Sequence, residues 1–256
     1  MLKFLQTSRR APGRPAFALV FWWTFVRGLI WLVFKLLYRL RCYGFEHVPR
    51  TGPVIYVANH QSHYDPPIAG ILVHDRPFAA MARASLFKFK PFAWMIRSIG
   101  AIDLERGKGD AGAMKAALAE LEAGRCVLIF PEGTRTRDGA LGEFQRGVML
   151  LIKRSCAPVM PIAIEGAFDI WPTTAARPKL SGRLGVMAAP PIPADELLKD
   201  GADTGLERLK RQIELMRLQL RDEMRRTSRG RYPAPGPGDE PYWARNAQAQ
   251  QQRQEQ

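Results

Sequence analysis

Two residues of this chain, His60 and Asp65, have side chains that together could move a proton. They follow an apolar run, residues 54–58, that predicts a buried strand, and they precede Pro66, which suits the first position of a helix. Inside one helix, five residues advance about 500°, which would leave the two side chains roughly 140° apart. The residue before a proline is biased away from the helical region, so we expect a turn that brings Asp65 back to His60. The imidazole would then take a proton from a hydroxyl while the carboxylate fixes its tautomer.

The same two residues also have structural interpretations. Asp65 is a good N-cap for the helix that Pro66 begins. A single histidine at the end of a strand is more often structural than catalytic. The pair by itself therefore leaves catalysis and helix capping open.

Three further stretches stand at the ends of apolar runs, where α/β proteins build their sites. They are residues 100–106, 130–137 and 159–164. Each is weak evidence alone, because a glycine or an arginine after a strand usually belongs to an ordinary turn. In this order and spacing, however, the four stretches resemble the four sequence blocks of the 1-acyl-glycerol-3-phosphate acyltransferase family, one of the glycerolipid acyltransferases.

The resemblance covers roughly residues 40–195 and is most specific in the first and third blocks. The first block of the family, Asn-His-x-x-x-x-Asp, is matched by Asn59, His60 and Asp65. The third, Phe-Pro-Glu-Gly-Thr-Arg, is matched without change by residues 130–135. These two matches carry most of the family assignment.

The other two blocks are shorter. The second ends in an arginine, matched by Arg106, and the fourth is a proline-centred apolar strand, matched by residues 159–164. Residues 144–147 also resemble the family, which often has a lysine near Arg146. The family fold is a mixed α/β sheet flanked by helices, and the alternation of apolar runs with helical stretches between residues 44 and 193 favours the same fold class.

The resemblance implies transfer of an acyl group from a thioester donor, acyl-CoA or acyl-ACP (acyl carrier protein), to a lysophospholipid acceptor. With 1-acyl-glycerol-3-phosphate as the acceptor, transfer to the sn-2 hydroxyl gives phosphatidic acid for phospholipid biosynthesis. His60 would be the general base and Asp65 would orient it. The donor is a co-substrate, and no cofactor or metal is implied. The three cysteines also lack metal-ligand spacing.

The acceptor carries a phosphate, which guanidinium groups bind bidentately. The resemblance therefore places Arg106 and Arg135 on this phosphate. Arg83 falls where relatives often carry a lysine and is a further candidate for substrate binding. The other predicted substrate-binding residues come from the third block and are Glu132, Gly133 and Thr134. Glu132 would hold an arginine or a glycerol hydroxyl, and Gly133 would permit a close backbone approach.

Other groups near the first block have no assigned role in the resemblance. His63 is not a family requirement and is most simply a variable position. Ser62 is the remaining candidate for a covalent acyl carrier, but no obvious partner in the sequence activates it. The candidates for oxyanion donors are backbone amides near His60 or Gly133.

The net charge of +14 is unevenly spread along the chain. No acidic residue precedes Glu46, whereas eight Lys and Arg residues do. Such a segment suits an anionic membrane surface or a nucleic acid. Residues 17–40 are dense in Phe, Trp, Leu and Val, and no nucleic-acid-binding motif is recognisable. We therefore expect a membrane as partner, and no nucleic acid.

The apolar N-terminal segment has two interpretations. Residues 16–26 are uninterrupted, Arg27 breaks the run, and residues 28–34 resume it. One interpretation is a single membrane-spanning helix. The favoured one is a pair of helices that lie in one leaflet and break near Arg27 and Gly28.

Three parts of the chain follow from these patterns. Residues 1–41 form a basic N-terminus with a membrane-associated helical segment, and residues 42–229 form the acyltransferase domain. Residues 230–256 are rich in Pro, Gly and Gln, which predicts a disordered tail. Within the domain, the clearest predicted strands and helix are residues 54–58, 126–130, 158–164 and 184–188, and residues 110–123.

A heptad-like apolar pattern at residues 206–220 predicts a further helix. It either packs on the domain or contacts a membrane or a partner.

Two other functions stay open at the level of sequence. The acceptor could be a different lysolipid, such as lyso-ornithine lipid or another lysophospholipid. The chain could also be a non-catalytic membrane-binding protein of the same fold, although the intact His60 and Asp65 pair argues against this. For the enzyme we expect a location at the cytoplasmic face of the inner membrane, where the amphiphilic acceptor resides.

Overall fold

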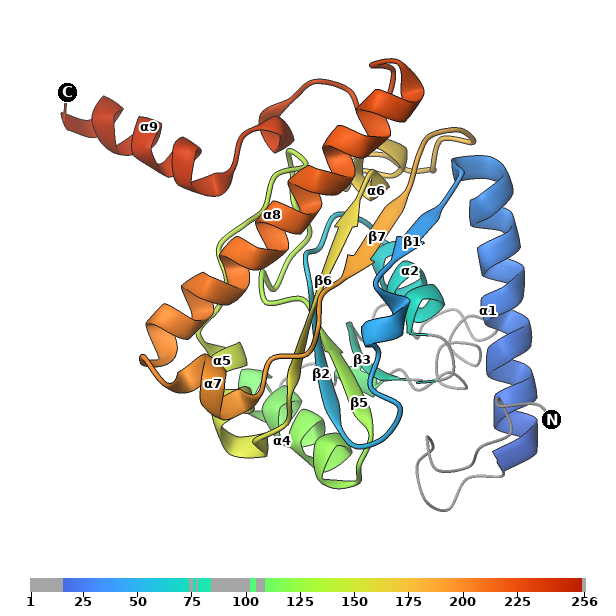
Figure 1. The fold of residues 1–256 in the computed structure, drawn as a ribbon, viewed down its shortest axis with the longest axis vertical. Helices are drawn as coiled ribbons and strands as arrows, with labels where there is room; N and C mark the ends of the chain where they lie inside the picture. The colour runs from blue at the N-terminus through green and yellow to red at the C-terminus, as the bar shows by residue number, and fades with distance from the viewer. Residues whose placement is uncertain (1–15, 74–75, 77, 84–101, 105–108, 255–256) are drawn as a thin grey trace.

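The structure, a computed structural model, describes residues 16–73, 76, 78–83, 102–104 and 109–254. At its centre lies a seven-stranded sheet in the order β1-β7-β6-β2-β5-β3-β4 (Figure 1). Helices pack on both faces of this sheet. The mixed α/β fold that the sequence predicts is therefore confirmed.

Most of the sheet is parallel. β2, β6, β5, β3 and β4 run in one direction, β7 is antiparallel to β6, and β1 is parallel to β7. The four strands that the sequence predicts most clearly are β2, β5, β6 and β7, with ends within one residue of those expected. The strands are β1 (Arg41–Tyr43), β2 (Val54–Ala58), β3 (Phe78–Arg83), β4 (Ile102–Leu104), β5 (Cys126–Ile129), β6 (Val159–Glu165) and β7 (Gly185–Ala188).

Helices alternate with the strands along the chain. The helices are α1 (Ala16–Tyr38), α2 (Asp65–Leu72), α4 (Gly109–Glu122), α5 (Gly147–Ser155), α6 (Ala167–Ile170), α7 (Ala194–Leu198), α8 (Ala202–Ser228) and α9 (Tyr242–Gln254). Two short 3-10 turns are η3 (Phe45–His47) and η5 (Pro237–Asp239). The predicted helix at residues 110–123 corresponds to α4, one residue earlier at each end.

β2 is buried along its whole length and supplies both layers of the core. Ile55 and Val57 join an apolar cluster with α4, α5 and α8. Val54, Tyr56 and Ala58 join a second cluster with α1 and α2. Because strand side chains alternate between the two faces, a strand covered on both sides has the uninterrupted apolar sequence found here.

α8 packs along one face of the sheet, against β6 and β7 (Figure 1). Its buried residues include Leu209, Ile213 and Leu220, which repeat at helical spacing. The interpretation of this pattern as a helix that packs on the domain is confirmed.

The N-terminal segment differs from the predicted pair of helices. α1 continues without a break through Arg27 and Gly28. A glycine inside a helix costs only about 1 kcal/mol relative to alanine, which one position does not turn into a break. Phe34 and Tyr38 are buried in the core, so the second half of α1 is part of the folded domain. None of the helices in the described ranges has the length and apolar character needed to cross a membrane.

The C-terminal residues are also ordered rather than disordered as predicted. Residues 230–254 form η5, α9 and the connections between them. Ion pairs of Asp239 with Arg221 and Arg225 of α8 fix this segment, and Tyr242 is buried. Composition does not predict these contacts, because the partners lie on α8 and are brought to the segment only by folding.

Candidate active site

Three of the predicted stretches lie at one edge of the sheet. β2 ends at Ala58 and leads into the turn that carries His60. β5 ends at Ile129, shortly before Glu132. β6, on the other side of β2, ends at Glu165. Because β2, β5 and β6 are parallel neighbours, their carboxyl ends form one edge, which is where α/β sheets bind ligands.

The predicted contact between His60 and Asp65 is present. His60 Nδ1 lies 2.7 Å from Asp65 Oδ2. The Asp65 side chain is fully buried, whereas that of His60 is 20% exposed, so the ring can be reached from outside and the carboxylate cannot. With Nδ1 engaged, Nε2 is the ring nitrogen left to exchange a proton with a substrate.

Asp65 closes the turn before α2 and does not cap the helix. Its Oδ2 accepts the backbone N–H of Gln61 at 2.5 Å and that of Ser62 at 2.7 Å. α2 begins at Asp65 itself, with Tyr64 as its N-cap residue and no side-chain cap. Burial raises the pKa of Asp65, although His60 and the two amides oppose the rise. The capping interpretation of Asp65 is therefore wrong, and the carboxylate holds the turn that carries the imidazole.

Glu132 has a different environment from the predicted one. Its Oε1 accepts the backbone N–H of His60 at 2.7 Å, and its Oε2 accepts that of Gly142 at 2.8 Å. The residue is 7% exposed. Burial outweighs the two N–H donors and raises the pKa of Glu132 to about 7. Both oxygens serve the backbone, so Glu132 joins the His60 turn to the loop after β5 instead of holding an arginine or a glycerol hydroxyl.

Phe130 and Gly133 shape the wall beside the imidazole. The Phe130 ring stacks on the His60 ring, with centroids 4.1 Å apart and an interplanar angle of 16°. The Gly133 N–H donates to Phe130 O at 3.0 Å and closes a tight turn. Gly133 has a φ of +67°, in the left-handed region that glycine adopts without strain. The glycine is needed here for the turn.

Thr134 and Arg135 follow this turn directly. Thr134 is exposed and Arg135 is half-buried. The next residue, Thr136, donates its N–H to His60 O at 2.8 Å. Arg135 is therefore one residue away from a backbone contact with the His60 turn.

One further predicted substrate-binding residue belongs to the far strands. Arg83 is the last residue of β3 and pairs in register with Leu104, the last residue of β4. Since both strands are parallel to β5, their ends lie at the same edge of the sheet as His60. Arg106 lies outside the described residues.

Other groups near His60 are already engaged. Ser62 is buried and donates to Trp171 O at 2.9 Å, which leaves it no access to a substrate. The His63 ring is exposed and lies 5.0 Å from the Trp171 ring. The sequence suggests backbone amides near His60 or Gly133 as oxyanion donors, and the amides of these two residues themselves donate within the protein.

Three residues matter here that the sequence did not single out for a role of their own. Asn59 ties β2 to β6, because its amide donates to Ile164 O at 2.8 Å and its Oδ1 accepts the Ile164 N–H at 2.7 Å. Gln61 donates from Nε2 to Glu165 Oε2 at 3.0 Å. The only sequence signal for Glu165 is an acidic residue at the end of an apolar strand.

The chain is similar to known acyltransferases. A family model described as "Acyltransferase" matches residues 39–165. The chloroplastic 1-acyl-sn-glycerol-3-phosphate acyltransferase LPAT1 of Arabidopsis thaliana is 31% identical over 139 residues, which are 53% of this chain and 38% of that protein. The 1-acyl-sn-glycerol-3-phosphate acyltransferase alpha of Mus musculus is 31% identical over 179 residues, 67% of this chain and 62% of that one.

A relative of different name and a solved structure also match. The lyso-ornithine lipid O-acyltransferase of Pseudomonas aeruginosa is 33% identical over 145 residues, 56% of this chain and 52% of that protein. The chain thus spans between 38% and 62% of the length of these three relatives. The crystal structure of the 1-acyl-sn-glycerophosphate (LPA) acyltransferase PlsC from Thermotoga maritima has a TM-score of 0.67 at 24% identity and covers 80% of this chain and 83% of that one. This last likeness concerns the fold.

Proposed function

Because the chain belongs to the acyltransferase family that includes the 1-acyl-sn-glycerol-3-phosphate acyltransferases, we propose that it transfers a fatty acyl group from a thioester to the sn-2 hydroxyl of 1-acyl-glycerol-3-phosphate. The product would be phosphatidic acid. The observation that carries the proposal is the buried Asp65 carboxylate 2.7 Å from Nδ1 of the accessible His60 ring.

His60 acts as the general base in this proposal. Its Nε2 takes the proton of the acceptor hydroxyl while the hydroxyl oxygen attacks the thioester carbonyl carbon and forms the new C–O bond. The tetrahedral intermediate then breaks its C–S bond, and His60 returns the proton to the departing thiolate. Asp65 stabilises the imidazolium between the two steps. The donor would be acyl-CoA or acyl-ACP, and the reaction consumes no cofactor.

Arg135, Arg106 and Arg83 are the proposed ligands of the acceptor phosphate. Arg135 follows the turn beside the His60 ring, and Arg83 ends β3 at the same sheet edge. Arg106 is proposed from the second sequence block alone. A phosphate monoester matches the fork geometry of guanidinium groups. Thr134, exposed next to Arg135, completes the proposed binding segment.

A second acceptor class is favoured by one observation. The Pseudomonas aeruginosa relative, at 33% identity, is named for lyso-ornithine lipid. An ornithine head group is an amino acid and would not require three phosphate-binding arginines. The acceptor therefore distinguishes the two functions.

The test is an acyl-transfer assay that crosses acceptors with donors. Purified protein is supplied with lysophosphatidic acid, lyso-ornithine lipid or another lysophospholipid, each with acyl-CoA and with acyl-ACP. We expect transfer to lysophosphatidic acid, and a loss of about 10²–10⁴-fold in kcat for the folded His60→Ala protein. Transfer to lyso-ornithine lipid alone would show that this lipid, and not lysophosphatidic acid, is the acceptor. Near-normal turnover by His60→Ala would show that His60 is not the general base.

A membrane surface is the proposed location, at the cytoplasmic face of the inner membrane. α1 exposes large apolar side chains along one side, at a spacing of three or four residues: Phe21, Phe25, Leu29, Leu32 and Leu36. We call these the α1 stripe. An exposed apolar stripe on a helix that does not span is suited to lie in the interface of a bilayer.

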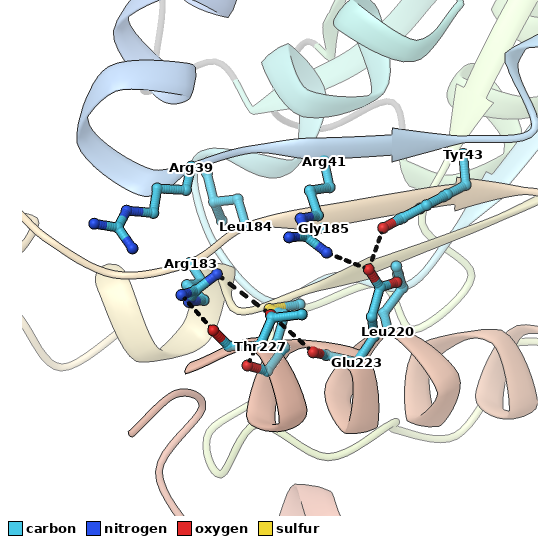
Figure 2. A pocket seen from close by; sticks show the side chains of 10 residues that line it. Arg39, Arg41, Tyr43, Arg183, Leu184, Gly185, Leu220, Glu223 and Thr227 are labelled. Carbon is cyan, nitrogen blue, oxygen red and sulfur yellow. Dashed lines mark hydrogen bonds and ion pairs between the residues drawn. The ribbon is translucent and has the colours of Figure 1, made fainter. Parts of the chain in front are cut away.

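Cationic side chains follow directly after the α1 stripe. Figure 2 shows Arg39, Arg41 and Arg183 around a hollow between the start of β1 and the last turns of α8. Arg41 pairs with Glu223 at 2.5 Å. Burial and the nearby positive charges of Arg39, Arg41 and Arg231 lower the pKa of Arg183. This excess of positive charge would attract the anionic head groups of the cytoplasmic leaflet.

Substitutions on the α1 stripe test the location without disturbing the core. Leu29→Gln, Leu32→Gln and Leu36→Gln together should strongly weaken sedimentation with vesicles that contain anionic phospholipid, because they remove three of the five apolar side chains of the α1 stripe. Leu180→Gln with Leu215→Gln is the matched control, since these leucines are 77% and 52% exposed elsewhere on the protein. Equal loss in both proteins would contradict the assignment of α1 as the membrane contact.

A further inference from the structure

Gln61, in the turn before α2, is held by three side-chain hydrogen bonds. Its Nε2 donates to Glu165 Oε2 at 3.0 Å and to Gly139 O at 3.3 Å. Its Oε1 accepts the Phe168 N–H at 3.3 Å. The backbone N–H of the same residue donates to Asp65 Oδ2 at 2.5 Å. The side chain of Gln61 thus joins the turn to Glu165, Gly139 and Phe168, and its backbone N–H holds the Asp65 carboxylate of the proposed catalytic pair.

Glu165 is fully buried, and two arginines of α8 compensate its charge. Its Oε2 lies 3.0 Å from Arg217 and its Oε1 lies 2.5 Å from Arg221. Arg217 is itself fully buried and also pairs with Glu214 at 2.7 Å. Removing one partner of such a group leaves an uncompensated buried charge, which is strongly unfavourable. The position of the Glu165 carboxylate is therefore set by α8.

The C-terminal segment, residues 230–254, reaches the same cluster in two places. Asp239 pairs with Arg221 Nε at 2.5 Å, and Nη1 of the same guanidinium pairs with Glu165. Gly238 lies so close to Gly139 that an added Cβ would stand 2.9 Å from the Gly139 oxygen. This is the carbonyl that accepts a bond from the glutamine side chain. The segment therefore contacts both supports of the Gln61 side chain, Gly139 directly and Glu165 through Arg221.

We propose that Gln61 and Glu165 are positioning residues for the His60–Asp65 pair, and that the C-terminal segment fixes them through Asp239 and Arg221. The proposal rests on the proposed acyl transfer by His60. None of these side chains needs to touch the substrate. Their effect is on geometry, to which proton transfer is sensitive, since a displacement of about 1 Å at a reacting group can cost on the order of 10²-fold in rate.

Gln61→Met tests the first link, because methionine keeps the volume and removes all three side-chain bonds. We expect kcat to fall by about 10²-fold with little change in either KM. We also expect loss of the downfield proton NMR signal of His60 Nδ1–H, which reports its bond to Asp65 and which His60→Ala identifies. Arg76→Met is the matched control: Arg76 is 2% exposed and bonded at the opposite end of the strands, so its loss should lower stability and leave the signal and kcat unchanged.

Asp239→Asn tests the contact between the C-terminal segment and Arg221. It is also the variant to use if Gln61→Met does not fold. It should weaken the NMR signal and lower kcat less than Gln61→Met, and Asp239→Glu should restore both. A full signal and an unchanged kcat in every folded variant would overturn the proposal and leave the cluster with a purely stabilising role. Loss of the signal in variants of a protein that acylates no acceptor would instead sustain the positioning and reject the proposed function.

Discussion

Glu132 and Glu165 are buried carboxylates at the same sheet edge, on opposite sides of β2, and their charges are compensated differently. Glu132 accepts backbone N–H groups from His60 and Gly142. Glu165 pairs with two guanidinium groups of α8. Backbone dipoles offset the loss of water less well than full opposite charges. The pKa of Glu132 consequently rises to about 7.

The difference separates two tasks. Glu132 accepts the backbone N–H of the proposed base, and burial raises its pKa to about 7. Glu165 is the centre of a buried ionic cluster that joins the sheet, α8 and the C-terminal segment. Although burial lowers the pKa of Arg217, Glu165 and Glu214 raise it above its ordinary value, so the Arg217 guanidinium stays charged. We expect changes around Glu132 to alter rate and pH dependence, and changes around Glu165 to alter stability together with the geometry of the His60–Asp65 pair.

The largest effect is expected at Asp65, which, like Glu132, holds the turn that carries His60. Asp65→Asn keeps an oxygen for the turn amides but no longer stabilises the imidazolium. We expect kcat to fall by about 10²–10⁴-fold while the far-UV circular dichroism spectrum is preserved. Full activity of the folded variant would show that Asp65 only closes the turn.

Arg217→Met, which removes a cation from the Glu165 cluster, should lower the stability of the protein. This change leaves Glu165 and Glu214 short of a buried cation, and we expect the free energy of unfolding in urea to fall by about 3–5 kcal/mol. Lys210→Met on the same helix is the control, because the partner of Lys210, Glu143, is 74% exposed and stays hydrated. A loss in Arg217→Met no greater than in the control would contradict the role of the cluster.

The stability of the protein should fall as the pH rises from about 4.5 to about 7 because of Glu132. Its pKa is raised from 4.5 to about 7 in the folded protein, so the native state binds more protons than the unfolded state within this window. The contribution is fully present below the lower value and lost above the upper one, in total roughly 3 kcal/mol at about 1.4 kcal/mol per pKa unit. Urea unfolding at several pH values measures it.

Glu132→Gln is the comparison for this pH series. The side chain of this variant cannot ionise, so its stability should vary less across the pH window. Its NH2 group replaces one carboxylate oxygen and cannot accept the backbone N–H there, so the variant should also be less stable overall. An unchanged slope would assign the pH dependence to other groups.

The smallest effect is expected at Gly142. A Cβ on this residue would stand 2.7 Å from Glu132 Oε2, so Gly142→Ala should displace the carboxylate from its N–H donor. We expect the unfolding free energy to fall by about 1–3 kcal/mol, with a decrease in kcat. Gly147→Ala is the matched control, because a Cβ there meets nothing within 4 Å. Equal behaviour of the two variants would show that Glu132 tolerates the displacement.

The sequence predicted the elements whose signals are local. The buried strand at residues 54–58, the turn after it and the helix α4 all follow from apolar runs, proline and periodicity. It misjudged features that depend on distant partners. The proposed helix break at Gly28 and the disordered tail after residue 230 are absent, because a continuous helix and the ion pairs of Asp239 are more favourable.

The chain by itself determined that His60 and Asp65 would meet, since Pro66 and a five-residue separation leave a turn as the way to join strand and helix. It also determined which blocks gather at the sheet edge, because parallel strands end together. Only the tertiary structure decided that Glu132 holds the backbone of His60 and that Glu165 is paired with α8. The physical reason is that a carboxylate is compensated by whichever donors folding brings to it, and Glu165 and Arg217 are 52 residues apart in the sequence.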